Sequence, residues 1–253
     1  ETGRVTGPQP RSGDDILMIY TGGTTGMPKG VMWRQDDLIR ALCTTGIPPI
    51  AGEMEDVGYD AILEFLAKPG APGMPACPLM HGTGWFTANM YLTQAGSLIT
   101  LVDRHLDVVE LLDTIEREGV GALTIVGDAF ARPLADELAH RPRDLSSLRH
   151  LLTGGAILSP SVQADLLRLL PELRIIDVLG SSETGRQAVA TTSADRPGGA
   201  GRFVPAATAA VLSEDRSRVL ADDDDTVGWL GQGGRVPRGY LGDPDKTIAT
   251  FPR

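Results

Sequence analysis

Short apolar runs that alternate with amphipathic stretches occupy the middle of this sequence and limit what it can fold into. The runs that predict strands are residues 97–102, 122–126, 149–153 and 173–179. Between the first two, residues 108–115 place apolar side chains at the i, i+3, i+4, i+7 spacing of one helix face, with Asp107 as a candidate cap and Gly119 as a candidate stop. Strands that alternate with helices predict an α/β fold, a mostly parallel β-sheet flanked by helices.

Two further segments extend this pattern. Residues 16–20 form an apolar run that predicts a buried strand, and the polar residues 34–40 fit a helix. Ser159-Pro160 is typical of a helix start, with the proline in the first turn, and the residues after it supply a buried stripe. The stripe consists of Val162, Leu166, Leu169 and Leu170.

Three segments rich in Gly, Ser or Thr each follow a predicted strand. They are residues 21–30, 154–156 and 180–185. Because ligands of parallel α/β sheets bind at the carboxyl ends of the strands, we expect these three segments to form one site.

The character of the sequence changes at about Arg196. Short segments such as residues 208–212, separated by turns and an acidic run at 222–225, favour a β-rich unit. We therefore predict an α/β core over residues 1–195 and a β-rich subdomain over residues 196–253, both partial.

Charge and cysteine content exclude several classes of protein. Lys plus Arg is 23 and Asp plus Glu is 33, a net charge of −10, which argues against nucleic acid or anionic lipid as a partner. The sequence has no apolar run long enough for a transmembrane segment. With only Cys43 and Cys77, a disulfide scaffold is excluded and a reducing, cytoplasmic compartment is favoured. The chain starts at Glu1 and stops at Arg253 without a closing element, so we expect a piece of a longer protein.

The segment Tyr20–Gly30 has the composition of a polyphosphate-binding loop. Its glycines let backbone N–H groups approach an anion, its three threonines add hydroxyl donors, and Lys29 adds a positive charge. It is not a Walker A loop, because Pro28 separates Gly26 from Lys29 and a glycine follows the lysine.

This segment resembles the signature loop of the adenylate-forming enzymes, which include acyl-CoA synthetases, luciferases and peptide-synthetase adenylation domains. Ten of the eleven positions fit, and Gly22 replaces the usual serine. The resemblance implies that the loop holds the β- and γ-phosphates of ATP, with Lys29 as a catalytic residue. The implied phosphate ligands are Thr21, Gly22, Gly23, Thr24, Thr25, Gly26 and Lys29.

Two more segments resemble blocks of the same family in the same order. Residues 78–84 match the block whose histidine, here His81, lies near the carboxylate end of the acyl site. Met80, Trp85 and Phe86 flank this histidine, and we expect them to make the acyl pocket apolar. Residues 144–149 lead to Thr153-Gly154-Gly155-Ala156, in which Gly154, Gly155 and Ala156 would form the platform for adenine.

Residues 177–184 resemble the family block Asn-x-Tyr-Gly-x-Thr-Glu. The match implies that Asp177 meets the adenine amino group, Ser182 binds the α-phosphate and Glu183 holds Mg²⁺. Leu179 replaces the aromatic residue that packs on adenine. The same turn adds Gly180 and Ser181 to the implied nucleotide site. A last block, residues 234–247, we interpret as structural, without chemistry.

The resemblance implies an acyl-CoA synthetase that uses ATP and Mg²⁺ to convert a carboxylic acid into an acyl-adenylate, with CoA as the acceptor. Trp33-Arg34 and the Gly-Ser-Ser-Glu turn are most similar to actinobacterial ligases for fatty or sterol side-chain acids. Two alternatives stay open: an adenylation domain that loads a carrier protein, and a non-catalytic nucleotide-binding module. The family's ribose-binding aspartate and the catalytic lysine of its C-terminal domain are not in this sequence, so we expect these residues alone to be inactive.

Overall fold

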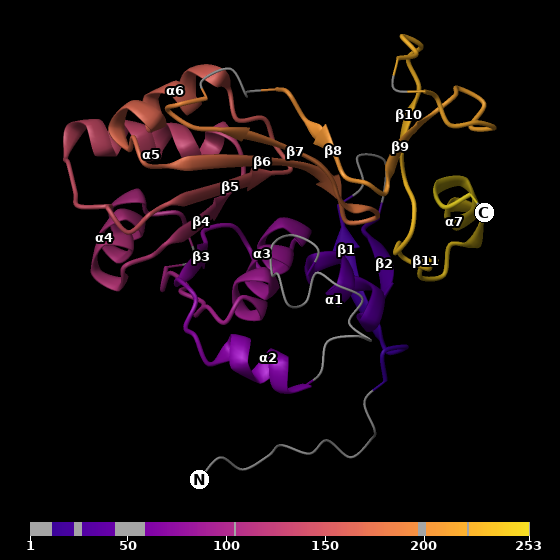
Figure 1. The fold of residues 1–253 in the computed structure, drawn as a ribbon, viewed down its shortest axis with the longest axis horizontal. Helices are drawn as coiled ribbons and strands as arrows, with labels where there is room; N and C mark the ends of the chain where they lie inside the picture. The colour runs from indigo at the N-terminus through magenta and orange to yellow at the C-terminus, as the bar shows by residue number, and fades with distance from the viewer. Residues whose placement is uncertain are drawn as a thin grey trace.

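A six-stranded sheet with helices on both faces forms the larger part of the fold (Figure 1). The computed structural model describes residues 12–22, 27–43, 59–103, 105–196, 201–221 and 223–252. In spatial order the strands are β3 (Gly73–Pro75), β4 (Ala122–Ile125), β5 (His150–Gly154), β6 (Arg174–Ser181), β7 (Gly185–Thr192) and β8 (Val204–Pro205). Strands β3 to β6 run parallel to one another, β7 pairs antiparallel with β6, and β8 pairs antiparallel with β7. The mostly parallel sheet confirms the predicted α/β class.

Helices α4 (Val108–Glu118), α5 (Asp128–His140) and α6 (Pro160–Leu169) cover one face and enclose the main core with the sheet. The predicted ends of α4 are confirmed: Asp107 Oδ1 accepts from the backbone N–H of Val109 at 2.8 Å, and Gly119 ends the helix at φ 63°. Pro160 begins α6 as expected, although the Ser159 side chain makes no capping bond.

Helix α3 (Gly82–Thr93) lies on the opposite face of the sheet, as Figure 1 shows. The buried Tyr91 hydroxyl is 2.6 Å from Thr124 Oγ1 of β4, which fixes the helix on the sheet. Burial raises the pKa of this phenol well above its usual value, so the hydroxyl stays neutral. Helix α1 (Gln35–Cys43) packs on α3, and α2 (Tyr59–Leu66) precedes β3.

A second, antiparallel sheet carries the segments on either side of the predicted phosphate loop. It consists of β1 (Ile16–Thr21), β2 (Lys29–Arg34) and β11 (Gly239–Tyr240). The loop therefore joins two antiparallel strands, and its expected place at the carboxyl end of a parallel strand is wrong. The physical reason is that β1 pairs with the strand that follows it directly, and hence stands outside the parallel sheet.

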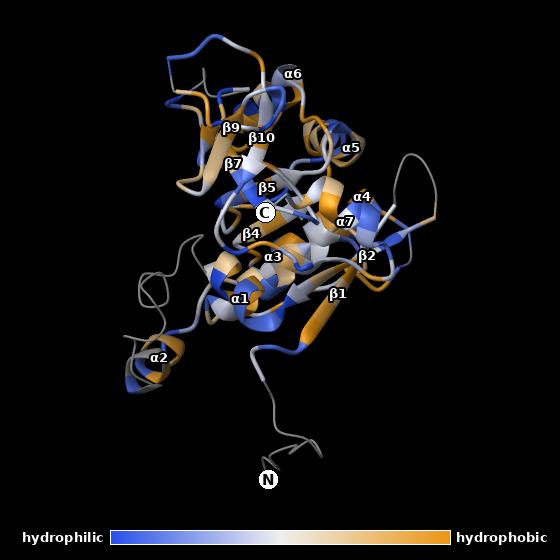
Figure 2. Ribbon diagram, turned by 90° about the vertical axis from the view of Figure 1, so that its right-hand side faces the viewer, coloured by the Kyte–Doolittle hydropathy of each residue, from blue (hydrophilic) through white to orange (hydrophobic). Residues whose placement is uncertain are grey.

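Strand β1 is also not the buried strand that its apolar run predicts. Ile16, Met18 and Tyr20 are exposed and only Ile19 is buried, although Figure 2 shows most of the strand as hydrophobic. In the part of the chain that the structure describes, β1 is an edge strand with one face packed on the Trp33 cluster and the other open. The predicted helix at residues 34–40 is confirmed as α1, which starts one residue later.

The strand expected at residues 97–102 is wrong as well. Its backbone makes only an isolated bridge from Leu98 to Gly73. The ladder cannot extend beyond Gly73 along β3, because Pro75, the next residue that faces this segment, carries no N–H group to donate.

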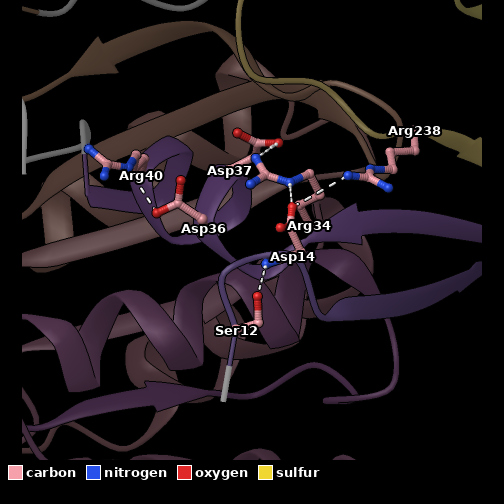
Figure 3. A network of polar contacts seen from close by, with 7 residues as sticks. All are labelled: Ser12, Asp14, Arg34, Asp36, Asp37, Arg40 and Arg238. Atoms are coloured by element: carbon pink, nitrogen blue, oxygen red, sulfur yellow. Dashed lines mark hydrogen bonds and ion pairs between the residues drawn. The ribbon is translucent and has the colours of Figure 1, made fainter. Parts of the chain in front are cut away.

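Ion pairs connect the elements of the antiparallel sheet at its outer end (Figure 3). Arg34 at the end of β2 pairs with Asp14 before β1 at 2.8 Å and with Asp37 in α1 at 2.9 Å. Arg238, directly before β11, reaches the same Asp14 at 3.5 Å. Ion pairs of this kind add little stability individually, but those of Asp14 with Arg34 and Arg238 join segments that are far apart in sequence.

The last part of the chain adds β9 (Ala209–Leu212) and β10 (Trp229–Gln232), which form a sheet of their own, and α7 (Pro244–Thr250). Strands β8 and β11 instead join the two larger sheets. The division into two subdomains near residue 196 stays a prediction. None of the helices in the described segments combines the length and the apolar composition that crossing a membrane requires.

Candidate functional site

A cavity of about 540 Å³ runs between helix α3 and the facing side of the six-stranded sheet. Thr124, Leu152 and Ile176 are register partners on adjacent strands, so they line the cavity from one face of the sheet. Phe86 and Met90 line it from α3. The walls are thus largely apolar along the strands.

The carboxyl ends of the strands give the same cavity a polar end. Eight of the residues that the sequence assigned to the site line it, and they come from four separate segments. These residues are Thr21, Gly22, His81, Gly154, Gly155, Gly180, Ser181 and Ser182.

The segments approach each other closely at this end. A Cβ placed on Gly82, next to His81, would lie 3.2 Å from Ser182 Oγ, so the start of α3 touches the turn after β6. Gly155 adopts φ 83°, a conformation that favours glycine, and a Cβ there would lie 3.4 Å from Thr83 Oγ1. The chain therefore brings together the implied acyl histidine, α-phosphate serine and adenine platform.

Buried Trp33 of β2 holds the turn that carries Ser182. Its indole Nε1 donates to the Ser182 carbonyl at 2.8 Å, while Ser181 Oγ accepts from the backbone N–H of Glu183 at 3.2 Å. One hydrogen bond inside the turn and one from β2 of the second sheet thus hold the turn in place. The sequence singled out Trp33 only as a mark of resemblance, and gave no sign of this contact.

Trp33→Phe should lower the free energy of unfolding by at least about 1–3 kcal/mol, because phenylalanine cannot donate to the partly buried Ser182 carbonyl and leaves a gap where the larger, fully buried indole packs. Urea denaturation of the full-length protein would measure it. Trp229→Phe is the matched control: this tryptophan is 53% exposed and donates to the Glu214 carbonyl, so we expect a change within about 0.5 kcal/mol. Equal effects of the two variants would contradict a special role of Trp33.

Lys29 and Glu183 both contact Tyr240, and neither lines the large cavity. The Tyr240 hydroxyl donates to Glu183 Oε1 at 2.8 Å, and Lys29 Nζ lies 5.4 Å from the centre of the Tyr240 ring. Burial and the neighbouring Glu183 carboxylate raise the pKa of Tyr240 to about 12. Lys29 also lines a second cavity of about 400 Å³ with Tyr20 and Asp243.

Tyr240 belongs to the block that we interpreted as structural, so the sequence analysis missed this connection. The Gly-Tyr pair of that block was the available signal. It could not be used, because β11 lies some two hundred residues from the phosphate loop and meets β2 only in the fold.

The remaining predicted nucleotide residues gather beside the large cavity without lining it. Thr153 pairs with Asp177 in the β5–β6 ladder, whereas Ala156 lies beside Gly127 after β4, where a Cβ on the glycine would be 2.9 Å from the Ala156 Cβ. Ile176 and Val178 line the cavity, so strand alternation places Asp177 on the other face, where burial raises the pKa of its carboxyl. Gly23, Thr24, Thr25 and Gly26 lie outside the described residues.

Only one of the three residues expected to make the acyl pocket apolar lines the cavity. Phe86 does so, but Met80 is 77% exposed in the turn before α3, and Trp85 packs on the Trp33 cluster. The apolar wall is built instead by sheet residues such as Leu152 and Ile176, which the sequence analysis assigned only to strands.

Among the described residues there is no group of three or more His, Cys, Asp or Glu side chains that could hold a metal. Glu183, next to the Ser182 hydroxyl, is a single carboxylate. This donor set fits Mg²⁺ of a nucleotide complex, which takes one or two protein carboxylates and keeps phosphate oxygens and waters as its other ligands.

The fold therefore places several of the predicted site residues together in one cavity at an edge of an α/β sheet. Residues 3–241 match the family model for the AMP-binding enzymes. The chain belongs to this family, which confirms the resemblance stated from the sequence.

Two relatives of this chain carry the names of acyl-CoA ligases. The chain is 40% identical over 94% of its length to the "Medium-chain acyl-CoA ligase Mig" of Mycobacterium avium, and spans 43% of that protein. It is 36% identical over 95% of its length to the "Medium/long-chain-fatty-acid--CoA/3-oxocholest-4-en-26-oate--CoA ligase" of Mycobacterium tuberculosis, and spans 44% of it. The chain therefore spans less than half the length of these relatives.

Solved structures show the same fold at lower identity. The luciferase-like enzyme of the Zophobas morio mealworm matches 97% of this chain with a TM-score of 0.70 at 18% identity, over 53% of its own length. ATP-bound MatB from Rhodopseudomonas palustris matches 94% with a TM-score of 0.68 at 23% identity, over 44% of its own length.

Proposed function

We propose that this chain supplies the phosphate, adenine and acyl sites of an ATP-dependent acid–thiol ligase, an acyl-CoA synthetase for fatty or sterol side-chain acids. The observation that carries the proposal is one cavity with an apolar wall along the sheet and a polar end that joins His81, Ser182 and the start of the phosphate loop. The printed names of the relatives at 36–40% identity support the substrate class.

The apolar part of the cavity suits the tail of the acid. Its volume of about 540 Å³ is typical of small-molecule sites, and apolar side chains from α3 and the sheet exclude water along it. The tail would run along β5, whose five residues span about 16 Å, and the carboxylate would lie at the polar end.

The polar end would position the two reactants. Ser182 would bind the α-phosphate, the glycine-rich loop with Thr21 and Lys29 would hold the β- and γ-phosphates, and His81 would contact the carboxylate. Because the reaction joins a carboxylate oxygen to the α-phosphorus and releases pyrophosphate, holding both groups in place is the main contribution of these residues. Adenine would rest on Gly154, Gly155 and Ala156, near Asp177 and Leu179.

Glu183 would hold Mg²⁺, oriented by the Tyr240 hydroxyl. A cation held there would supply positive charge to neutralise the phosphates. CoA would then take the acyl group, in a reaction that also depends on residues outside this sequence. We further propose a cytoplasmic location, in keeping with these substrates and with the free thiol of Cys77.

The test is a reaction of the full-length protein with octanoate, ATP, Mg²⁺ and CoA, followed by pyrophosphate release and by mass spectrometry of the thioester. We expect octanoyl-CoA, and turnover with 3-oxocholest-4-en-26-oate measured in parallel would show how far the pocket accepts sterol acids. An amino acid should be inactive.

Two results would reject the proposal. Acid-dependent ATP–pyrophosphate exchange without consumption of CoA would indicate a domain that loads a carrier protein. ATP binding without exchange for any acid would indicate a non-catalytic nucleotide-binding module.

A further inference from the structure

Arg186 is the one permanently charged side chain among the described residues that line the 540 Å³ cavity. It lies at the start of β7, where it pairs with Gly180 of β6, beside the turn that carries Ser181 and Ser182. It is therefore at the polar end of the cavity.

The guanidinium has no hydrogen bond or ion pair with any residue in the described segments. Arg186 is partly buried, and burial lowers the pKa of its guanidinium because no neighbouring carboxylate compensates for the lost water. The contrast with other arginines of the chain is clear, since Arg34 and Arg143 each pair with two carboxylates. In a chain with ten more acidic than basic residues, a partly buried and unpaired arginine indicates a counter-ion supplied by a ligand.

Two anionic groups enter such a site, the carboxylate of the acid and the phosphates of ATP, and guanidinium binds both types of oxyanion well. The phosphate-loop lysine, Lys29, lines the other cavity, near Tyr240. Arg186 instead shares its cavity with the apolar wall, including Val178 and Val189. Of the two anionic groups, this position favours the carboxylate of the acid as the ligand of Arg186, because the carboxylate is attached to an apolar tail.

We propose that Arg186 binds the carboxylate of the acid substrate and makes the cavity selective for acids over neutral molecules with the same tail. The inference rests on the proposed function and adds the residue that recognises the acid. One carboxylate oxygen would pair with Arg186, which leaves the other free to attack the α-phosphorus. The oxygen that pairs with Arg186 becomes the carbonyl oxygen of the acyl-adenylate and loses its negative charge. Arg186 therefore contributes mainly to binding of the acid and less to the chemical step.

The experiment compares octanoate with octan-1-ol, two probes with the same tail and different charge, by calorimetry on the full-length protein. We expect wild type to bind octanoate at least about 10-fold more tightly than the alcohol. Arg186→Met should weaken octanoate binding by about 10- to 100-fold, leave octan-1-ol unchanged and leave the KM for ATP unchanged. Arg186→Lys should restore part of the preference, because a positive charge remains without the planar fork.

Arg174→Met is the control for loss of a positive charge. Arg174 is exposed at the opposite end of β6, and the variant should bind both probes as wild type does. Thermal denaturation of each variant confirms that it is folded.

Three results would overturn the inference. Equal weakening of octanoate and octan-1-ol in Arg186→Met would show a purely structural role, and a raised KM for ATP with unchanged octanoate binding would assign Arg186 to phosphate. No preference for octanoate in wild type would also reject it. Failure of the proposed function has a different signature: octanoate binding that depends on Arg186, without acid-dependent pyrophosphate exchange.

Discussion

Glu183→Gln should lower acid-dependent pyrophosphate exchange by about 100- to 1,000-fold, the effect expected when a charged group that acts on the transferring phosphates is removed. Glutamine keeps the shape of the side chain and an oxygen that can accept from the Tyr240 hydroxyl, which lies 2.8 Å from Glu183 Oε1 in the native protein. The melting temperature should therefore change little. The loss should appear in kcat more than in the KM for the acid, because Glu183 does not line the large cavity.

Glu172→Gln provides the matched control. The Glu172 side chain is 82% exposed, pairs with Arg149 at 3.2 Å and lies before the start of β6, at the end opposite the Ser182 turn, so this variant should exchange pyrophosphate at the wild-type rate. Calorimetry of Mg·ATP binding gives a second readout, in which Glu183→Gln should lose the dependence of affinity on Mg²⁺. Full exchange activity in Glu183→Gln, or an activity loss that follows only the loss of folded protein, would contradict the assignment.

Local signals explain which parts of the fold could be predicted. The spacing of apolar residues in 108–115, the Asp107 cap and the Gly119 stop all act within one helix, and α4 forms as expected from them. The same holds for β4, β5 and β6, whose apolar runs are bounded by glycines and turns. Their alternation with helices was sufficient to predict the parallel sheet.

Long-range pairing explains what could not be predicted. The apolar run of β1 looks like a core strand, but its neighbours are β2 and, beyond it, β11 from the far end of the chain. Residues 29–34 begin with Lys-Gly and contain an apolar run of only three residues, Val31-Met32-Trp33, which is too short to predict a strand by itself. Ile16 and Met18 are exposed because β1 pairs with β2 at the edge of a sheet that β11 completes, and this pairing is visible only in the fold.

The candidate site shows the same limit. Motif order located His81 and Ser182, and the fold places both at one cavity. Arg186 reads in sequence as part of a polar turn, and only its pairing with Gly180 puts it in that cavity. Tyr240 likewise acquires its contacts with Glu183 and Lys29 because β11 pairs with β2.

Tyr240 is expected to connect the metal carboxylate to the phosphate-loop lysine, and two substitutions separate its two contacts. Tyr240→Phe removes the hydroxyl that orients Glu183 but keeps the ring next to Lys29, with its edge-on contact to Phe251 at 5.6 Å. Loss of such a second contact on a metal ligand costs about 10- to 100-fold in metal affinity, so half-maximal exchange should need at least about 10-fold more Mg²⁺.

Tyr240→Leu removes the ring as well. Because a cation–π contact contributes about 0.5–1 kcal/mol, pyrophosphate binding by calorimetry should weaken a further few-fold relative to Tyr240→Phe. The pKa of Tyr240 is about 12, so its hydroxyl stays protonated across pH 6–9 and the pH profile of exchange should keep its shape in both variants. Tyr20→Phe, at a tyrosine that is 55% exposed and lines the same cavity as Lys29, should leave the Mg²⁺ requirement unchanged. If Tyr240→Phe and wild type need the same Mg²⁺ concentration, Tyr240 only packs in the fold and Glu183 is held in place by the turn alone.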